Sequence, residues 1–311
     1  MSGHGVDVVC ADPAFVDLTF AGLEALPAPG EERHSADLLR TPGGAATVAV
    51  GAARLGLTAA LASPLGDDAE GAFVREALAA EGVQVTPRTA ARTAVTAVLP
   101  LGGERAMVTF DPQNEATRED VERFAPRAAV VSCPRTAIVP DGVALYATIG
   151  DADARAHAGA PLPAGVARAR ALIVNAREAR LLTGFDDPED TAKALAERVA
   201  RVVVTLGPDG AVTAAGAELE RVEGFAVGDP VDTTGAGDLF TAAYVWSDLS
   251  GAEPEERLRW ACLAAGLSVR VPTAVAGAQT QEQLAAAGAE HGLAVPGWLD
   301  PSKEEESECS E

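Results

Sequence analysis

The chain has 311 residues, 48% of them hydrophobic, so it is long enough to bury a full core as one large domain. Its formal net charge of -22 at pH 7 would repel a nucleic-acid backbone or an anionic membrane, which argues against both as partners. The four cysteines lie far apart, without the spacing of a metal site or a disulfide framework, and the first residues lack the pattern of a signal peptide, so we expect a cytoplasmic protein.

The first part of the chain predicts two sheets. Residues 6–10 are a short apolar run typical of a buried parallel strand. Residues 14–42 alternate only loosely between polar and apolar side chains, and residues 93–99 and 106–110 flank a Gly-Gly pair as the strands of a β-hairpin do. We expect residues of about 14–42 and 89–111 to form a small β-sheet that covers the main domain as a lid.

The stretch from residue 43 to residue 65 contains a single charged side chain and is long enough to cross a bilayer. Glycines divide it into two halves, however. This favours a buried helix that begins after Gly43-Gly44 and ends at Gly56, followed by a strand over residues 58–62.

A further helix is expected over residues 69–81, with Phe73, Ala77 and Ala80 on its apolar face. Beyond it, strands and helices alternate in the pattern of a doubly wound, mostly parallel α/β sheet flanked by helices. The expected strands in this part are residues 128–132, 144–148, 170–174, 201–206 and 211–214, and the expected helices follow residue 174, ending at Gly184, and cover 190–200.

The motif Asp232-Thr233-Thr234-Gly235-Ala236-Gly237-Asp238 precedes an apolar run with helical spacing from Phe240 onward. Asp238 is therefore expected in the first turn of a helix. The N-terminus of a helix has unpaired N–H groups and a positive dipole end, and the small side chains of the motif let an anion approach them. A cap on the helix is the alternative reading, but a cap needs neither Gly-Ala-Gly nor two threonines.

This motif resembles the second signature of the ribokinase-like (PfkB) carbohydrate kinase family. The resemblance implies that Asp238 is the base that takes a proton from a substrate hydroxyl, and that Gly235, Ala236 and Gly237 form an anion hole for the transferred phosphoryl group. It covers the chain to about Gly297, so we expect residues 1–300 to be the kinase domain and residues 301–311 an acidic, disordered tail.

The resemblance also implies a sugar site. Gly43 and Gly44 match a glycine pair that lines it in the family, and Asp17 matches an acid that accepts hydrogen bonds from substrate hydroxyls; a surface acid on an edge strand is the other reading of Asp17. The family's Asn is replaced here by Thr47, one residue earlier, so the family's substrate does not carry over. Arg105, in the hairpin, is a weaker candidate for a contact over the substrate.

The nucleotide and cation sites follow from the same resemblance. Asn175, Thr205, Gly207, Gly210 and Cys262 are expected to bind ATP, the last within an adenine pocket that includes residues 260–262 and 277–279. Glu178 is expected to hold Mg²⁺ through water, although it could also be an ordinary acid in the first turn of a helix. Asp232 and Thr234 match positions that bind a monovalent cation such as K⁺, unless Asp232 only pairs with backbone N–H groups.

We therefore expect an ATP-dependent phosphotransferase that acts on a hydroxyl group of a sugar or related small molecule, with a nucleoside as the other acceptor class. A sensor that binds sugars or nucleosides on the same fold without turnover is the competing hypothesis, because the region around Thr47 is altered. A Walker-type NTPase is excluded because Lys193 and Lys303 are the only lysines and neither follows a Gly-rich loop. Exposed edges of the lid suggest a homodimer.

Overall fold

The computed structural model describes residues 5–101 and 104–294, so the predicted acidic tail lies outside the described residues. The main sheet has nine strands in the order β15-β14-β13-β12-β11-β10-β1-β4-β6. The seven strands from β6 to β13 run parallel, whereas β14 and β15 add an antiparallel hairpin at one edge. This is the doubly wound, mostly parallel α/β sheet expected from the sequence.

The strands of the main sheet are short and strongly apolar. They are β1 (Val8–Cys10), β4 (Ala59–Leu61), β6 (Gln84–Val85), β10 (Ala128–Ser132), β11 (Ala144–Thr148), β12 (Ala171–Asn175), β13 (Val202–Thr205), β14 (Ala211–Ala215) and β15 (Glu218–Val222). The helices are α1 (Ala45–Arg54), α2 (Ala69–Ala80), α3 (Arg118–Glu122), α4 (Asp151–Ala156), α5 (Ala176–Thr183), α6 (Pro188–Ala196), α7 (Ala236–Leu249), α8 (Pro254–Ser268), α9 (Ala274–Gly277) and α10 (Gln281–Glu290). Three short 3₁₀ helices cover Cys133–Ile138, Ala164–Arg168 and Gly207–Asp209.

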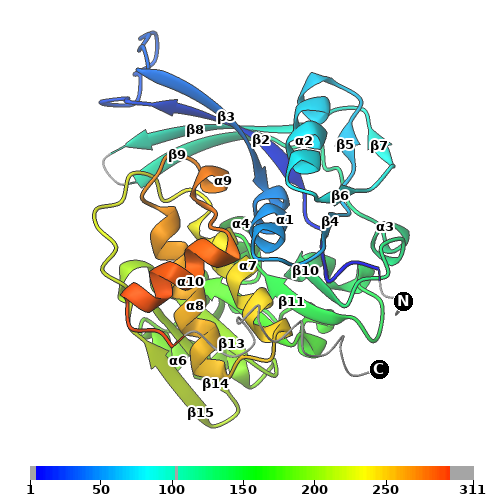
Figure 1. Cartoon of the computed structure of the whole chain (residues 1–311), viewed down its shortest axis with the longest axis vertical. Coiled ribbons are helices and arrows are strands. Elements are labelled where there is room, and N and C mark those ends of the chain that lie inside the picture. The colour runs from blue at the N-terminus through cyan, green and yellow to red at the C-terminus, as the bar shows by residue number, and fades with distance from the viewer. Residues whose placement is uncertain (1–4, 102–103, 295–311) are drawn as a thin grey trace.

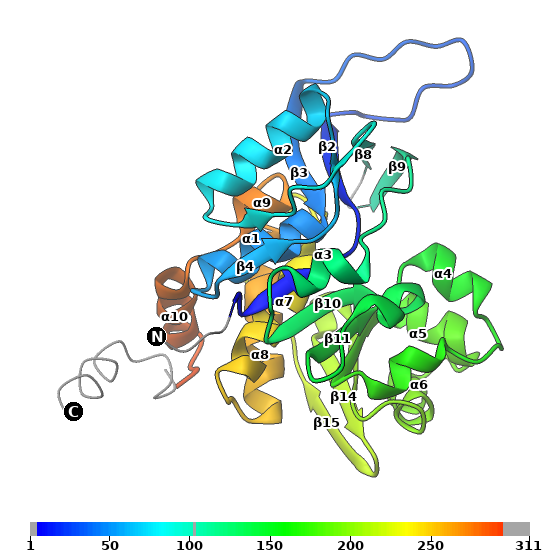
Figure 2. The ribbon, with the colours of Figure 1, turned by 90° about the vertical axis from the view of Figure 1, so that its right-hand side faces the viewer.

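Successive residues of each central strand point to opposite faces of the sheet, which gives the molecule two hydrophobic cores. Val8 and Val203 pack with α1, α7 and α8, whereas Val9 and Val202 pack with residues of α5 and α6 on the other face. Figure 2 shows this three-layer arrangement, with α1, α7, α8 and α10 on one side of the sheet and α4, α5 and α6 on the other. Because both faces are covered, the strands read as continuous apolar runs in the sequence.

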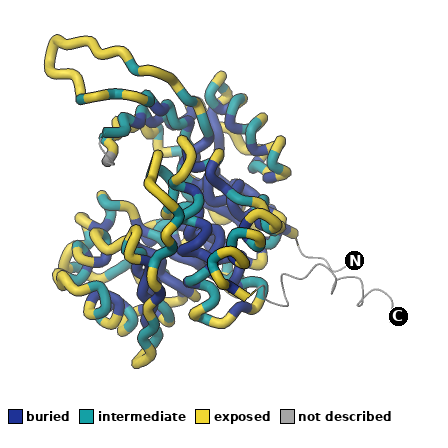
Figure 3. Tube along the Cα trace, turned by 60° about the vertical axis from the view of Figure 1, so that its left-hand side comes forward, coloured by how far each residue is buried: buried dark blue, intermediate teal, exposed yellow. Residues whose placement is uncertain are grey.

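A second sheet projects above the first (Figure 1). Its four strands are β3 (Asp37–Gly44), β2 (Ala14–Ala21), β8 (Ala94–Leu101) and β9 (Glu104–Phe110), in that order across the sheet. Two-residue strands β5 (Leu65–Gly66) and β7 (Thr89–Ala90) form a small parallel pair beside it. The long connection between β2 and β3 is almost entirely exposed, in contrast to the central strands (Figure 3).

The structure corrects two details of the predicted elements. Helix α2 buries Gly71, Val74 and Leu78 rather than the predicted face, and Phe73 lies partly exposed under the guanidinium of Arg40. Helix α6 begins and ends earlier than expected, because Asp187 caps it with hydrogen bonds to two backbone N–H groups. The apolar stretch after Gly43 is, as predicted, a helix followed by a strand, and no helix in the described part of the chain is long and apolar enough to cross a membrane.

Candidate active site

The turn before α7 is built around a glycine that no other residue could replace without strain. Gly235 has φ 72°, in the left-handed region, and a Cβ atom added to it would lie 2.2 Å from Ala274 Cβ and 3.4 Å from Thr47 Cγ2. The turn is therefore packed between helix α1 and Ala274, the first residue of α9. Thr47 is 1% exposed and packs beneath the turn, and its contact with a substrate stays a prediction.

Helix α7 begins without a side-chain cap, so its first N–H groups depend on other acceptors. Ala236 N–H donates a long hydrogen bond of 3.4 Å to Thr233 O. The N–H groups of Gly237 and Asp238 have no acceptor within residues 5–101 and 104–294. Gly237 is exposed, and a Cβ atom added there would meet no atom within 4 Å, so the first turn of α7 borders open space. The turn thus has the free donors that an anion requires.

Buried contacts hold helix α7 in place at both of its ends. Close to its start, Gly51 of α1 allows contact with Leu239 and Ala242; a Cβ atom at Gly51 would lie 2.7 Å from Leu239 Cδ2. At its other end the Asp248 carboxylate, 1% exposed, accepts hydrogen bonds from Arg170 and Tyr146 and pairs with Arg257 Nη1 at 2.7 Å. A buried carboxylate needs such partners to offset its desolvation.

Asp238 lies in the first turn of α7, as predicted, and several charged side chains influence its pKa. Burial raises its pKa to about 7, and the negative charges of Asp17, Asp12 and Glu178 add to that rise, whereas Arg105 opposes it. A carboxyl group with a pKa near neutrality can accept and release a proton at physiological pH.

Asp17 of β2 faces the same space. Its Oδ2 lies 2.0 Å from where a Cβ atom of Gly43 would be, so only glycine fits beside this carboxylate. Burial and the charge of Asp232 raise the pKa of Asp17 to about 6, and a hydrogen bond with Thr96 and the charge of Arg105 moderate that rise. Gly44 in turn borders the ring of Phe15 and has φ 61°, which sets the chain direction into α1.

Asp232 fixes the loop that leads into the turn. Its Oδ1 accepts from Thr234 N–H at 2.8 Å and its Oδ2 accepts from Thr273 N–H at 3.0 Å, so both carboxylate oxygens pair with backbone N–H groups. Thr273 adopts φ 71°, a left-handed conformation that is costly for a β-branched residue. The hydroxyl of Thr234 is buried and has no hydrogen-bond partner in the described part of the chain.

Two of the predicted nucleotide residues meet at the edge of the main sheet. Asn175 and Thr205 end the parallel strands β12 and β13 and are register partners, so they lie side by side. Asn175 and Glu178 form a reciprocal capping box at the start of α5, with Asn175 N–H to Glu178 Oε2 and Glu178 N–H to Asn175 Oδ1 both at 2.9 Å. Burial raises the pKa of Glu178 to about 7 despite these hydrogen bonds.

The remaining nucleotide residues differ in their surroundings. Gly207 borders open space, whereas a Cβ atom at Gly210 would lie 2.0 Å from Val222 O, so Gly210 serves the packing of the β14–β15 hairpin. Cys262 is 7% exposed within the core around α8, and its ATP contact stays a prediction. Trp260 is enclosed by Trp246 and Gly288, so it does not line an adenine pocket as expected.

A polar cluster beside Asp238 was not predicted. Asp12 follows β1 and accepts a hydrogen bond of 2.6 Å from Ser132 Oγ at the end of β10, with Arg135 Nη1 at 3.7 Å. Burial raises the pKa of Asp12 even though both neighbours favour its charged form. The signal in the sequence is position alone: Asp12 and Ser132 stand at the carboxyl ends of neighbouring parallel strands, where sites of such sheets gather.

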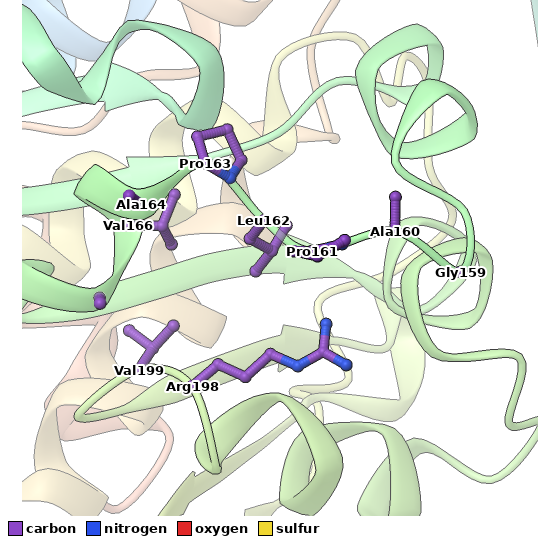
Figure 4. A pocket seen from close by; sticks show the side chains of 10 residues that line it. Gly159, Ala160, Pro161, Leu162, Pro163, Ala164, Val166, Arg198 and Val199 are labelled. Carbon is purple, nitrogen blue, oxygen red and sulfur yellow. The ribbon is translucent and has the colours of Figure 1, made fainter.

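The described residues hold no group of three or more His, Cys, Asp or Glu side chains arranged to bind a metal directly. A cavity of about 440 Å³ lies on another part of the molecule, lined by residues 159–164, 166, 167, 198 and 199 (Figure 4). Its lining is apolar apart from Arg198 and includes none of the predicted site residues.

Comparisons with known proteins agree with this geometry. The model of the pfkB family carbohydrate kinases matches residues 7–281. The chain is 30% identical over 262 residues to "Ribokinase" of Bacillus subtilis (strain 168), covering 78% of this chain and 86% of that protein. Among solved structures, a putative ribokinase from Agrobacterium tumefaciens has a TM-score of 0.77 at 23% identity, covering 92% of this chain and 98% of that one.

Another similar structure is Arabidopsis thaliana ribokinase complexed with ribose and ATP. Its TM-score is 0.73 at 24% identity, and the match covers 90% of this chain and 97% of that chain. At this identity the likeness shows the fold, and the family model shows the membership. The chain belongs to the pfkB family of carbohydrate kinases.

Proposed function

We propose that the protein transfers the γ-phosphoryl group of ATP to a hydroxyl group of a sugar or related small molecule, with Asp238 as the base. The observation that supports this most is the uncapped start of α7, where free N–H groups border open space next to an acid with a pKa of about 7. Phosphoryl transfer asks a protein mainly to position its reactants and to offset developing negative charge.

The proposed roles follow from the placement of each group. In this proposal residues 235–237 form the anion hole for the transferred phosphoryl group, and the close packing of Gly235 against Ala274 keeps their turn in place. The Gly237 N–H group has no acceptor among the described residues, and the hydrogen bond from Ala236 N–H to Thr233 O is long, at 3.4 Å. Asp238 accepts the proton of the attacking hydroxyl late in the transfer, when that hydroxyl becomes acidic. Asp17 accepts hydrogen bonds from other hydroxyls of the acceptor and so orients it. Asn175, Thr205 and Gly207 are the nucleotide contacts, at the ends of β12 and β13.

Glu178 fits the predicted Mg²⁺ site, because its Oε2 is used by the capping box while its other oxygen is left for a metal-bound water. When bound, Mg²⁺ would neutralise part of the negative charge of the phosphates. Asp232 and Thr234 form the proposed K⁺ site. The buried Thr234 hydroxyl lacks a partner among the described residues, and each oxygen of Asp232, although it accepts a backbone N–H group, keeps a lone pair for a cation. Isothermal titration of K⁺ into the wild type and into Thr234→Val tests this, and equal binding by both proteins would contradict it.

A coupled assay of ADP release with a panel of sugars and nucleosides, at fixed ATP and Mg²⁺, tests the proposed function. We expect saturable, acceptor-dependent ADP release that Asp238→Asn abolishes while ATP binding is retained. The sensor hypothesis predicts the opposite pattern, with saturable binding of a sugar or nucleoside and no ADP release for any tight ligand. The ionisable Asp238 beside free N–H groups favours the kinase, because a sensor needs neither feature.

We further propose that two copies of the chain associate through the second sheet. Its edge strand β9 exposes Met107, Val108 and Phe110, and Val108 is 69% exposed. An apolar edge strand of this kind is a template for pairing with another copy. Sedimentation analysis should give a dimer for the wild type and a monomer for Val108→Lys; a monomeric wild type would refute the proposal.

A further inference from the structure

One hydrogen bond joins the second sheet to the turn in front of α7. Arg105, in β9, donates from Nη1 to Thr233 Oγ1 over 3.1 Å, across 128 positions of sequence. Within residues 5–101 and 104–294 it is the one hydrogen bond between the second sheet and residues 223–238. The contact therefore ties the sheet that lies above the site to the segment that carries the free N–H groups.

The guanidinium of Arg105 keeps most of its hydrogen-bonding capacity. Arginine carries five N–H donors, and Thr233 uses one of them. Among the ion pairs of the described residues, none includes Arg105, so its charge is not neutralised by a carboxylate in contact with it.

The charged groups around Asp238 indicate the role of Arg105. Asp17 of β2, Asp12 after β1 and Glu178 of α5 all raise the pKa of Asp238, and Arg105 is the cation that opposes them. The thiol of Cys10, beneath the site, contributes no charge because burial raises its pKa far above neutrality. Arg105 has the same effect on Asp17, whose pKa is raised by burial and by Asp232.

We propose that Arg105 is a positioning residue of this site: its hydrogen bond to Thr233 holds the second sheet over the turn and places its positive charge among the acids that surround Asp238. The purpose of this arrangement rests on the proposed function, since a base has to be ionised before it can accept a proton. The electrostatic claim itself concerns the free protein.

Three variants separate charge from contact. Arg105→Gln removes the charge, Arg105→Lys retains it with a different geometry, and Thr233→Val removes the acceptor while leaving the arginine. Each variant is measured in two ways: the pH dependence of kcat and KM with ATP and the best acceptor, and isotope-edited NMR titration of aspartate carboxyl groups without ligands. Asp238→Asn identifies the Asp238 resonance by its absence.

We expect Arg105→Gln to move the Asp238 midpoint, and the acidic limb of kcat, to higher pH by roughly half to one unit, the effect of one charge somewhat beyond contact distance. Arg105→Lys should restore both midpoints. Thr233→Val should leave the midpoint unchanged and raise the KM of the acceptor by roughly fivefold, which corresponds to one hydrogen bond.

Identical titration midpoints of Asp238 in the wild type and in Arg105→Gln would overturn the inference. An equal loss of kcat in Arg105→Gln and Arg105→Lys at every pH would also overturn it, because it would show a merely structural role. The two proposals fail separately. If no acceptor is phosphorylated by the wild type but the NMR midpoints differ as expected, the proposed function is wrong and the role of Arg105 in the charge of Asp238 stands.

Discussion

Replacing the proposed base should make the protein more stable as well as inactive. The folded-state pKa of Asp238 is raised from 3.8 to about 7, because burial and three neighbouring acids disfavour its charged form. The folded state therefore keeps this proton to a higher pH than the unfolded chain, and stability falls as the pH rises from about 4 to about 7. Asp238→Asn removes the charge and with it this loss.

The size of the effect follows from the shift. Roughly three pH units at about 1.4 kcal/mol each give a ceiling of about 4 kcal/mol above pH 7. Because Asp238 is partly exposed, solvent screening reduces this to on the order of 1–2 kcal/mol. For a chain of 311 residues that corresponds to a rise in Tm of roughly 1.5–3 °C.

Differential scanning calorimetry of both proteins between pH 4 and pH 8 measures this. The Tm of Asp238→Asn should exceed that of the wild type by a margin that is small near pH 4, grows toward pH 7 and is constant above it. Asp229→Asn, the same change at an exposed position of the preceding loop, is the control and should leave Tm unchanged. A margin that is absent or independent of pH would refute the assignment of a raised pKa to Asp238.

Three further predictions concern the scaffold. Gly235→Ala should lower the free energy of unfolding by roughly 2–4 kcal/mol in a urea titration, because the turn requires φ 72° and has no room for a Cβ atom. Gly237 faces open space, so Gly237→Val should unfold like the wild type yet lose phosphoryl transfer. Equal stability of the two variants would contradict this prediction. Asp248→Asn should cost about 3 kcal/mol by the same measurement, since it breaks a buried carboxylate network, and a loss within error of zero would show that the network is dispensable. The pKa of Asp120 is held at about 2, against the effect of burial, by Arg88 and its other partners, so the stability it contributes should be lost as the pH falls from about 4 to about 2, and Arg88→Gln should flatten that part of the curve.

The fold was predictable wherever burial dictates a simple pattern. Strands such as β10 and β11 are covered on both faces and appear as uninterrupted apolar runs, and the predicted bounds match the structure. Helix α2 shows the limit of that reasoning. Its sequence offers two apolar faces, of which the one with Val74 and Leu78 is buried, while Phe73 lies partly exposed under Arg40.

The site was predictable where its residues are contiguous. Gly235 and Asp238 belong to one local turn, so their sequence specifies their geometry. The burial of Thr47 beneath the turn was not predictable from the sequence, because it depends on how α1 packs against α7. Asp12 and Arg105 depend on contacts between distant elements, and a pattern along the chain carries no information about which distant charge a side chain will face.

Transfer of a labelled phosphoryl group tests the central claim most directly. Wild-type protein is incubated with Mg²⁺, ATP labelled with a heavy oxygen isotope in its γ-phosphate, and ribose or adenosine, and the products are analysed by mass spectrometry. The account predicts a labelled phosphate ester of one acceptor from the wild type and none from Asp238→Asn. Label found only in inorganic phosphate, or an ester formed equally well by Asp238→Asn, would contradict it.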